Sequence, residues 1–236
     1  MDLSLIIPVY NEEECIEKTV REARGVLAGM PRSYEIIAVD DGSRDRTPAI
    51  LRQLANEIPE LRIVTIKPNS GQSAAFGAGF RVARGGTVIL MDADGQNDPA
   101  DIPRLLDGLA TCDVCCGYRA RRQDTFSKRI GSRLANRIRS RLLGDGVIDT
   151  GCSLKAFKAE VVKDLPMNLS GMHRFLPALA RMRGAAIQQI PVGHRARMAG
   201  VSRYTNWGRL RQTIWDLWAV RWMQKRYRRF SIEVVR

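Results

Sequence analysis

The first half of the chain alternates short apolar runs with longer segments that have the period of an amphipathic helix. The apolar runs predict strands at residues 3–9, 34–39, 62–67, 87–91 and 114–118. The segments between them predict helices at residues 12–27, 45–58, 70–84 and 99–109. Apolar strands separated by helices are typical of a parallel sheet with both faces covered. The pattern therefore predicts an α/β fold with a mostly parallel central sheet covered by helices on both faces.

The second half of the chain has a less regular pattern. It predicts a basic helix at residues 126–143, a turn and short strand at 149–158, a helix at 173–182, a strand at 188–192 and a last helix at 207–230. We therefore divide the chain into one domain, residues 1–206, and a C-terminal helix with its tail, residues 207–236.

The last predicted helix is amphipathic. Trp215, Trp218 and Trp222 share one helical face, because they recur at i, i+3 and i+7. The basic residues around and after them are Arg221, Lys225, Arg226, Arg228 and Arg229. Tryptophan together with basic residues suits the headgroup region of an anionic membrane. We expect this segment to lie on a membrane surface or to dock on a small membrane-anchoring protein. The alternative is a core-packing helix with a solvated basic end.

Composition narrows the class of protein. A length of 236 residues with 44% hydrophobic content predicts one large domain, with or without an appendage. No run approaches the roughly 20 apolar residues of a membrane span, and the N-terminus lacks the basic region of a signal peptide. Five cysteines, an odd number, favour a reducing compartment. A zinc site at Cys112, Cys115 and Cys116 is the alternative, but a buried strand is preferred because no second pair follows at zinc-finger spacing.

The net charge of +13 is concentrated in two segments. Residues 119–143 hold nine Lys and Arg against one acid, and the chain from Arg195 onward holds eleven against two. Two local basic surfaces indicate anionic partners at defined places. Nucleic acid is not expected as a partner, because the acidic clusters of the first half would repel its phosphates.

Three predicted strands end in acidic or amide side chains. Asn11 follows the first strand, Asp40 and Asp41 follow the second, and Asp92 and Asp94 follow the fourth. Ligands of open parallel sheets bind beyond the carboxyl ends of the strands, so we expect these side chains at one edge of the sheet. Asp40 is the better candidate for a nucleotide contact, since Asp41 is followed by Gly42 and suits a turn.

The Asp-x-Asp pair of Asp92 and Asp94 predicts a site for Mg²⁺ or Mn²⁺. These ions take one or two carboxylates together with substrate phosphates. The alternative is a solvated helix-capping loop, because Asp98 precedes Pro99 at a predicted helix start. Neither a GxGxxG nor a GxxxxGK[ST] motif is present, which argues against dinucleotide oxidoreductases and P-loop enzymes.

Seven motifs, in order along most of the chain, carry a resemblance to a known family. They are Pro8-Val9-Tyr10-Asn11-Glu12, Asp40-Asp41-Gly42-Ser43, Asn69-Ser70-Gly71, Asp92-Ala93-Asp94-Gly95-Gln96, Gly117-Tyr118-Arg119, Asp149-Thr150-Gly151 and Gly200-Val201-Ser202-Arg203-Tyr204. The chain from Met1 to about Asn206 resembles the family 2 glycosyltransferases of GT-A fold, particularly dolichol-phosphate mannose synthases and bacterial polyprenyl-phosphate sugar transferases.

The resemblance implies a set of site residues. The nucleotide base and ribose would contact Pro8, Tyr10, Glu12 and Asp40. Asp92 would contact the ribose or the metal, and Asp94 with Gln96 would coordinate the metal on the diphosphate. The lipid phosphate would be received by Arg119, Arg129, Ser132 and Arg133, with Asp149 in the same catalytic group. The far side of the donor diphosphate would be clamped by Arg197 and Arg203. The family often has the acceptor arginine where this chain has Lys128, which leaves open whether Lys128, Arg129 or Arg133 binds the phosphate.

The activity implied is a metal-dependent, inverting transfer of a hexose onto a polyprenyl (dolichyl or undecaprenyl) phosphate at the cytoplasmic membrane face. Mannose from GDP-mannose is the first expectation; a UDP-sugar carrying glucose or an amino sugar is the alternative, and a catalytically dead, membrane-recruited scaffold is another. A phosphate monoester, with a second pKa of about 6, is already a nucleophile at neutral pH. Such an acceptor needs no general base, and neither His173 nor His194 falls within the strand-end clusters. His194, beside Arg195, is interpreted as structural or diphosphate-associated.

Overall fold

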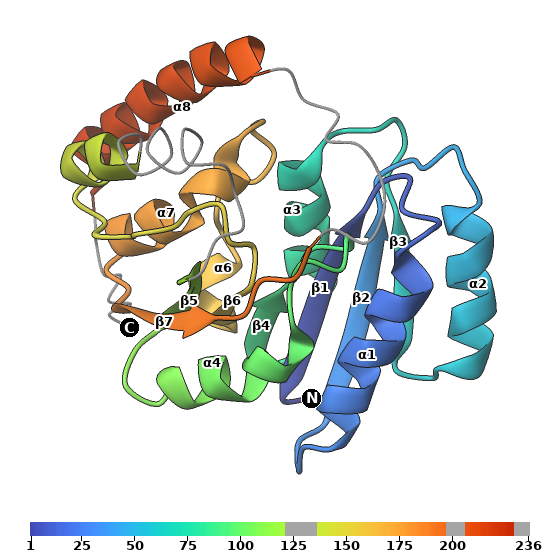
Figure 1. Ribbon diagram of the computed structural model, residues 1–236. Helices are drawn as coiled ribbons and strands as arrows, with labels where there is room; N and C mark the ends of the chain where they lie inside the picture. Colours follow the sequence, from blue (N-terminus) through green and yellow to red (C-terminus); the bar gives the residue numbers. More distant parts are fainter. Residues whose placement is uncertain (121–135, 197–205, 229–236) are drawn as a thin grey trace, which may run out of the picture.

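The central sheet has seven strands in the order β3-β2-β1-β4-β6-β5-β7 (Figure 1). The computed structural model describes residues 1–120, 136–196 and 206–228. The strands are β1 (Leu3–Val9), β2 (Tyr34–Asp40), β3 (Leu61–Thr65), β4 (Thr87–Leu90), β5 (Val114–Arg119), β6 (Lys155–Lys158) and β7 (Ile187–Val192). Strand β6 runs antiparallel to its neighbours β4 and β5, and the other pairings are parallel. The predicted mostly parallel sheet is confirmed.

Helices cover both faces of the sheet. They are α1 (Ile16–Ala28), α2 (Thr47–Glu57), α3 (Gln72–Val82), η1 (Pro99–Asp101), α4 (Ile102–Gly108), α6 (Ala159–Val162), η2 (Met172–Phe175), α7 (Leu176–Met182) and α8 (Asn206–Arg226), and residues 136–143 are also helical. Successive residues of β1 point to opposite faces, so Leu5 joins one buried core and Ile6 the other. The first core is shared with α1, α2 and α4, and the second with α3 and α7.

Helix α3 lies unusually close to the sheet. A Cβ atom added at Gly79 would come within 2.5 Å of Cγ2 of Ile6 in β1. Only a residue without a side chain allows this approach, which explains the small residues that the sequence places in this helix. The close contact fixes where the first turn of α3 stands relative to the ends of the strands.

Two predicted helices are divided in the structure for one physical reason. The segment predicted at 99–109 consists of η1 and α4, and the segment predicted at 173–182 consists of η2 and α7. Pro103 and Pro177 stand in the first turns of α4 and α7. A proline has no N–H to donate to the preceding turn, so an α-helix begins at the proline and a tighter turn precedes it.

Helix α8 packs on the second core through one side only. Val220 is fully buried, and Leu217 and Met223 pack partly buried against the same cluster. The amide of Gln224 donates to the carbonyl of Leu143, at 2.9 Å, and ties α8 to the 136–143 helix beside it (Figure 1). None of the helices in the described part of the chain combines the length and apolarity of a membrane span.

Candidate active site

The loops that follow β1 and β2 are joined at the carboxyl edge of the sheet. The backbone N–H of Asn11 donates to Oγ of Ser43 at 2.9 Å, and Oδ1 of Asn11 accepts from the N–H of Arg44 at 2.7 Å. Asn11 has a φ of 53°, a left-handed conformation that asparagine tolerates better than most residues. The N–H of Glu12 donates to Oγ1 of Thr47 at 2.9 Å. The two loops therefore form one surface.

This surface carries the residues predicted to hold the nucleotide. Pro8 is half-buried in β1, and Tyr10 and Glu12 are half-buried just beyond it. Asp40 ends β2 directly opposite Val9, is 3% exposed, and accepts the N–H of Ser43 at 2.9 Å through Oδ1. The four residues stand on neighbouring strand ends.

Asp41 has a structural role of its own. Its carboxylate accepts from Nδ2 of Asn69 at 2.9 Å and from the backbone N–H groups of Ser70 at 2.8 Å and Gly71 at 2.7 Å. These bonds hold the segment that leads into α3. Within the turn itself it is Asp40 that accepts the N–H of Ser43, while the carboxylate of Asp41 holds a distant segment.

The Asp-x-Asp loop follows β4 and is fixed from two sides. Oδ1 of Asp92 accepts from Nε2 of Gln72 in α3 at 2.9 Å. The N–H of Asp92 donates to Oδ1 of Asn97 at 3.0 Å, and the same oxygen accepts from Oγ of Ser153 at 2.7 Å. Asp94 is 8% exposed and accepts from the N–H of Gln96 at 3.1 Å. The loop is therefore built with its acidic side chains held in place.

The two acidic side chains of the loop repel each other. Burial, together with the negative charge of Asp94, raises the pKa of Asp92 to about 6. The nearby Ser153 hydroxyl and the charges of Lys155 and Arg119 lower the pKa of Asp92 and so act in the opposite direction. A divalent cation would relieve this repulsion, since its positive charge favours the ionised form of both carboxylates.

The helix-capping role that the sequence also suggested for this loop is filled by Asp98, not by Asp92 or Asp94. Oδ1 of Asp98 accepts from the N–H of Ala100 at 3.0 Å and so caps η1. Arg195 forms ion pairs with Asp98 at 2.9 Å and Glu22 at 2.6 Å, and its N–H donates to the carbonyl of Gln96 at 3.0 Å. Arg195 thereby connects α1, the Asp-x-Asp loop and the segment after β7.

Arg119 and Asp149 form an ion pair at the same edge. Nε and Nη2 of Arg119 donate to the two carboxylate oxygens of Asp149 at 2.7 and 2.9 Å. The side chains are 15% and 7% exposed. Asp149 also accepts the N–H of Gly151 at 3.1 Å, so its own position is fixed by its loop. Because β6 is antiparallel, the loop before it reaches the edge where β4 and β5 end.

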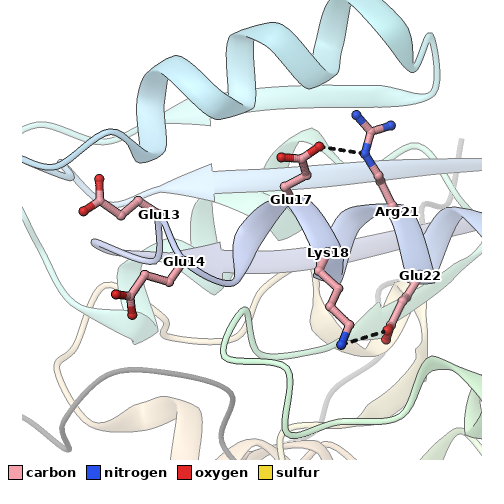
Figure 2. Close-up of a pocket in the computed structure, with 6 residues that line it drawn as sticks. All are labelled: Glu13, Glu14, Glu17, Lys18, Arg21 and Glu22. Carbon is pink, nitrogen blue, oxygen red and sulfur yellow. Dashed lines mark hydrogen bonds and ion pairs between the residues drawn. The ribbon is translucent and has the colours of Figure 1, made fainter.

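A separate hollow of about 400 Å³ lies along the exposed side of α1 (Figure 2). Its side chains pair with one another, Arg21 with Glu17 at 2.9 Å and Lys18 with Glu22 at 3.8 Å. Exposed pairs of this kind are ordinary on a helix surface. We therefore assign the candidate site to the strand ends.

The model of the family described as "Glycosyl transferase family 2" matches residues 4–166 of the chain. The chain belongs to this family. The match spans β1 to α6 and thus includes the nucleotide-side loops, the Asp-x-Asp loop and the Arg119–Asp149 pair.

Two curated relatives of this family 2 chain are both named as polyprenyl-phosphate sugar enzymes. It is 38% identical over 210 residues to a dodecaprenyl-phosphate galacturonate synthase from Rhizobium johnstonii, covering 86% of this chain and 62% of the relative. It is also 38% identical over 205 residues to an undecaprenyl-phosphate 4-deoxy-4-formamido-L-arabinose transferase from Edwardsiella ictaluri, with the same coverage of 86% and 62%. The chain thus spans somewhat less than two thirds of these relatives.

Solved structures establish the GT-A type of fold. Glucosyl-3-phosphoglycerate synthase from Mycobacterium tuberculosis, in complex with Mn²⁺, UDP and glucosyl-3-phosphoglycerate, superposes with a TM-score of 0.69. The alignment covers 94% of this chain and 79% of that one, at 20% identity. The likeness concerns the fold, which is the one expected from the motifs.

The residues of the family 2 chain fit a hard divalent cation. Asp92 and Asp94 are oxygen donors that repel each other, and Gln96 adds an amide oxygen on the same loop. Mg²⁺ and Mn²⁺ bind one or two carboxylates and take further oxygens from substrate phosphates. Among the described residues, no group of three or more His, Cys, Asp or Glu side chains gathers at one point. A carboxylate pair with a bound diphosphate is the arrangement that the donor set suits.

Several predicted site residues lie outside the described residues. They are Lys128, Arg129, Ser132, Arg133, Arg197 and Arg203.

Sequence reasoning missed three contacts at the site. Gln72 contacts Asp92, and Asn97 joins the Asp-x-Asp loop to Ser153. His173 was placed apart from the strand-end clusters, but its ring nitrogen Nδ1 lies 2.9 Å from Oγ of Ser73, next to Gln72. The position of Gln72, directly after the Asn69-Ser70-Gly71 motif, was the one sequence feature that could have indicated its place at the site. The contacts of Asn97 with Ser153 and of Ser73 with His173 join segments far apart in the chain, and no sequence feature indicated them.

Proposed function

We propose that this chain transfers a sugar from a nucleoside diphosphate sugar to a polyprenyl phosphate, with inversion at the anomeric carbon and with a divalent cation, Mg²⁺ or Mn²⁺. The observation that carries the proposal is that the acidic Asp-x-Asp loop and the Arg119–Asp149 ion pair lie at the same edge of the sheet. Asp92 and Asp94 suit a divalent cation that also binds the donor diphosphate. Arg119, whose guanidinium is oriented by Asp149, suits the phosphate of the acceptor. The names of the two relatives, both polyprenyl-phosphate sugar enzymes, support the acceptor class.

A UDP-sugar is the donor we favour. The relatives are named for galacturonate and for 4-deoxy-4-formamido-L-arabinose, and structures of glucosyl-3-phosphoglycerate synthase, which has this fold, hold UDP with Mn²⁺ or Mg²⁺. Mannose from GDP-mannose, the first expectation from the motifs, has no support among these proteins. The dolichyl-phosphate mannosyltransferase type is therefore the less favoured form of the proposal, and UDP-linked glucose, amino sugars and uronic acids come before it.

The proposed reaction assigns a task to each side of the site. Pro8, Tyr10, Glu12 and Asp40 hold the nucleoside. The acceptor phosphate oxygen forms a bond to the anomeric carbon while the bond from that carbon to the donor diphosphate breaks, and the nucleoside diphosphate leaves. No proton has to be removed, because the acceptor phosphate is already ionised at neutral pH. Asp92 and Asp94 would hold the divalent cation, which would supply positive charge to the leaving diphosphate.

The basic residues complete this assignment. Arg119 receives the acceptor phosphate, and its pairing with Asp149 keeps the planar guanidinium in one orientation. The acceptor-side residues Arg129, Ser132 and Arg133 and the donor-side residues Arg197 and Arg203, which the family resemblance supplied, lie outside the described residues. Their roles stay proposals on sequence grounds.

We place the reaction at an anionic membrane surface on its cytoplasmic face, with residues 207–236 as the membrane-associating segment. Trp215, Trp218 and Trp222 are 69%, 58% and 62% exposed, on the side of α8 away from its buried Val220. Lys225, Arg226 and Arg228 are also exposed at the end of the helix. Exposed tryptophan beside exposed positive charge complements a headgroup layer. A small membrane-anchoring protein is the other partner considered for this face.

The decisive experiment is a transfer assay with undecaprenyl phosphate and Mn²⁺, using UDP-galacturonate, UDP-glucose, UDP-4-deoxy-4-formamido-L-arabinose and GDP-mannose in parallel. We expect a lipid-linked sugar from at least one UDP-sugar and none from GDP-mannose. A product from GDP-mannose alone would reverse the donor assignment. Failure of the folded protein both to transfer and to hydrolyse any donor would support the catalytically dead scaffold.

A further inference from the structure

Asp92 is hydrogen-bonded through its side chain to a helix that belongs to another layer of the fold. Its Oδ1 accepts from Nε2 of Gln72 at 2.9 Å. An ionised carboxylate can only accept, so the amide of Gln72 presents its NH₂ group to Asp92. Gln72 is the first residue of α3, and Gly71, not a side chain, caps that helix. The side-chain amide of Gln72 therefore does not cap its own helix but donates a hydrogen bond to the Asp-x-Asp loop.

The position of Gln72 is itself fixed on three sides. Just before it, the N–H groups of Ser70 and Gly71 are held by Asp41, at 2.8 and 2.7 Å. Just after it, Oγ of Ser73 lies 2.9 Å from Nδ1 of His173 and accepts the N–H of His173 at 3.2 Å. Further along, Gly79 brings α3 against β1. A side chain on so well-held a helix start can orient its partner.

We propose that Gln72 is a positioning residue for the metal carboxylate Asp92. By donating to Oδ1 it fixes the rotation of the carboxylate of Asp92. The role rests on the proposed function, since it presumes that Asp92 meets the cation. Partners that hydrogen-bond to metal-binding carboxylates set their orientation, and their loss typically weakens metal affinity or activity about 10- to 100-fold.

Gln72→Met tests the role, because methionine keeps the length of the side chain and removes the amide. Gln72→Ala is the second variant, since alanine is the strongest helix former and protects folding at the start of α3. The matched control is Gln53→Met in α2, where Nε2 of an exposed glutamine also donates to a carboxylate, Glu57, at 3.3 Å. The two methionine variants remove the same amide at different places in the chain.

The readout is Mn²⁺ affinity in the presence of saturating UDP, measured by calorimetric titration, together with the thermal midpoint without metal. We expect the two Gln72 variants to bind Mn²⁺ at least about 10-fold more weakly, with midpoints close to wild type and with Gln53→Met unchanged. UDP affinity without metal should also be unchanged, which a merely unfolded or distorted site would not allow.

Two results would overturn the inference in distinguishable ways. If wild type binds Mn²⁺ with UDP and a folded Gln72 variant binds it within about two-fold, Gln72 does not position Asp92. If wild type itself binds no Mn²⁺ in the presence of UDP, the metal assignment of the proposed function fails first. Ser73→Ala, which removes the contact to His173, should weaken Mn²⁺ binding less than Gln72→Met, because it acts only through Gln72.

Discussion

Asp149 accepts two hydrogen bonds from the guanidinium of Arg119, and the two side chains are largely buried at the edge where the acidic loop also lies. Replacing one of the two residues would leave the other as an unpaired buried charge, which is unfavourable. Asp149 comes from the loop before the one antiparallel strand of the described sheet, and Arg119 ends β5. The pair therefore holds two loops as well as one arginine.

Asp149→Asn should lower activity about 10- to 100-fold through the acceptor, because Arg119 loses a charged partner and its fixed orientation. We expect a higher acceptor KM or a lower kcat, with nucleotide affinity unchanged. Asp164→Asn is the control, since Asp164 pairs with Arg183 at 3.0 Å but is 78% exposed. Equal losses in both variants would argue against a specific role for Asp149.

Asp94→Ala should abolish transfer and metal-dependent donor binding while the protein remains folded. Asp94 contributes one of the two carboxylates of the Asp-x-Asp pair, and the strand that supports it is unchanged. Donor binding is measured with and without Mn²⁺, next to Asp107→Ala, an exposed acid on α4. Turnover retained by folded Asp94→Ala would refute the metal assignment.

The raised pKa of Asp92, about 6, predicts a pH effect on the metal-free protein. An ordinary aspartate in the unfolded chain has a pKa of about 3.9, so between roughly pH 4 and 6 the folded state holds the proton more tightly. Stability should therefore fall as pH rises through this window. Asp92→Asn keeps an acceptor for Gln72 and carries no charge.

We expect metal-free Asp92→Asn to be more stable than wild type at pH 7, with the difference shrinking near pH 4. Comparing the two proteins at each pH removes the contribution of other titrating groups. Thermal or urea unfolding across this range provides the measurement. A difference that does not vary with pH would show that Asp92 titrates normally.

Substitutions on the exposed face of α8 should reduce membrane binding without unfolding the protein. Trp215→Ser with Trp218→Ser is preferred to truncation, because removing α8 would uncover the core around Val220. Co-sedimentation with anionic vesicles should decrease, and activity on long polyprenyl phosphate should fall more than activity on a short, soluble acceptor. High salt should act in the same direction.

The control for α8 is Leu169→Ser, a change of another exposed apolar residue, 44% exposed, outside the helix. If the tryptophan variant binds vesicles as well as wild type does, the exposed face has another partner. The small membrane-anchoring protein then becomes the preferred occupant.

Arg129→Ala and Arg133→Ala should impair the acceptor step and leave nucleotide affinity nearly unchanged. Losing a charge-assisted hydrogen bond costs about 1.5–3 kcal/mol, roughly ten- to a hundred-fold in affinity or rate. Arg52→Ala, on the exposed side of α2, provides the comparison. Loss of donor binding in both variants would move the basic segment to the donor side of the reaction.

The sequence alone was sufficient to predict the layered fold, and it was sufficient to bring the candidate site residues to one edge of the sheet. Hydrophobic periodicity records which face of each element is buried, and a parallel strand necessarily presents its following loop at its carboxyl end. Asp40, Asp92 and Asp94 were predicted there for this reason. The family motifs added Arg119 and Asp149 as site residues but did not indicate that the two side chains pair with each other.

Only the tertiary structure decided how those residues are paired and supported. Ser73 and His173 are 100 residues apart, and Arg119 and Asp149 are 30 apart. Periodicity carries no information about such contacts, because they depend on the order of the strands, with β6 inserted between β4 and β5. The same holds for α8, whose pattern suited either a core helix or a surface helix. In the structure α8 has features of both, since Val220 is buried against the second core while the three tryptophans are exposed.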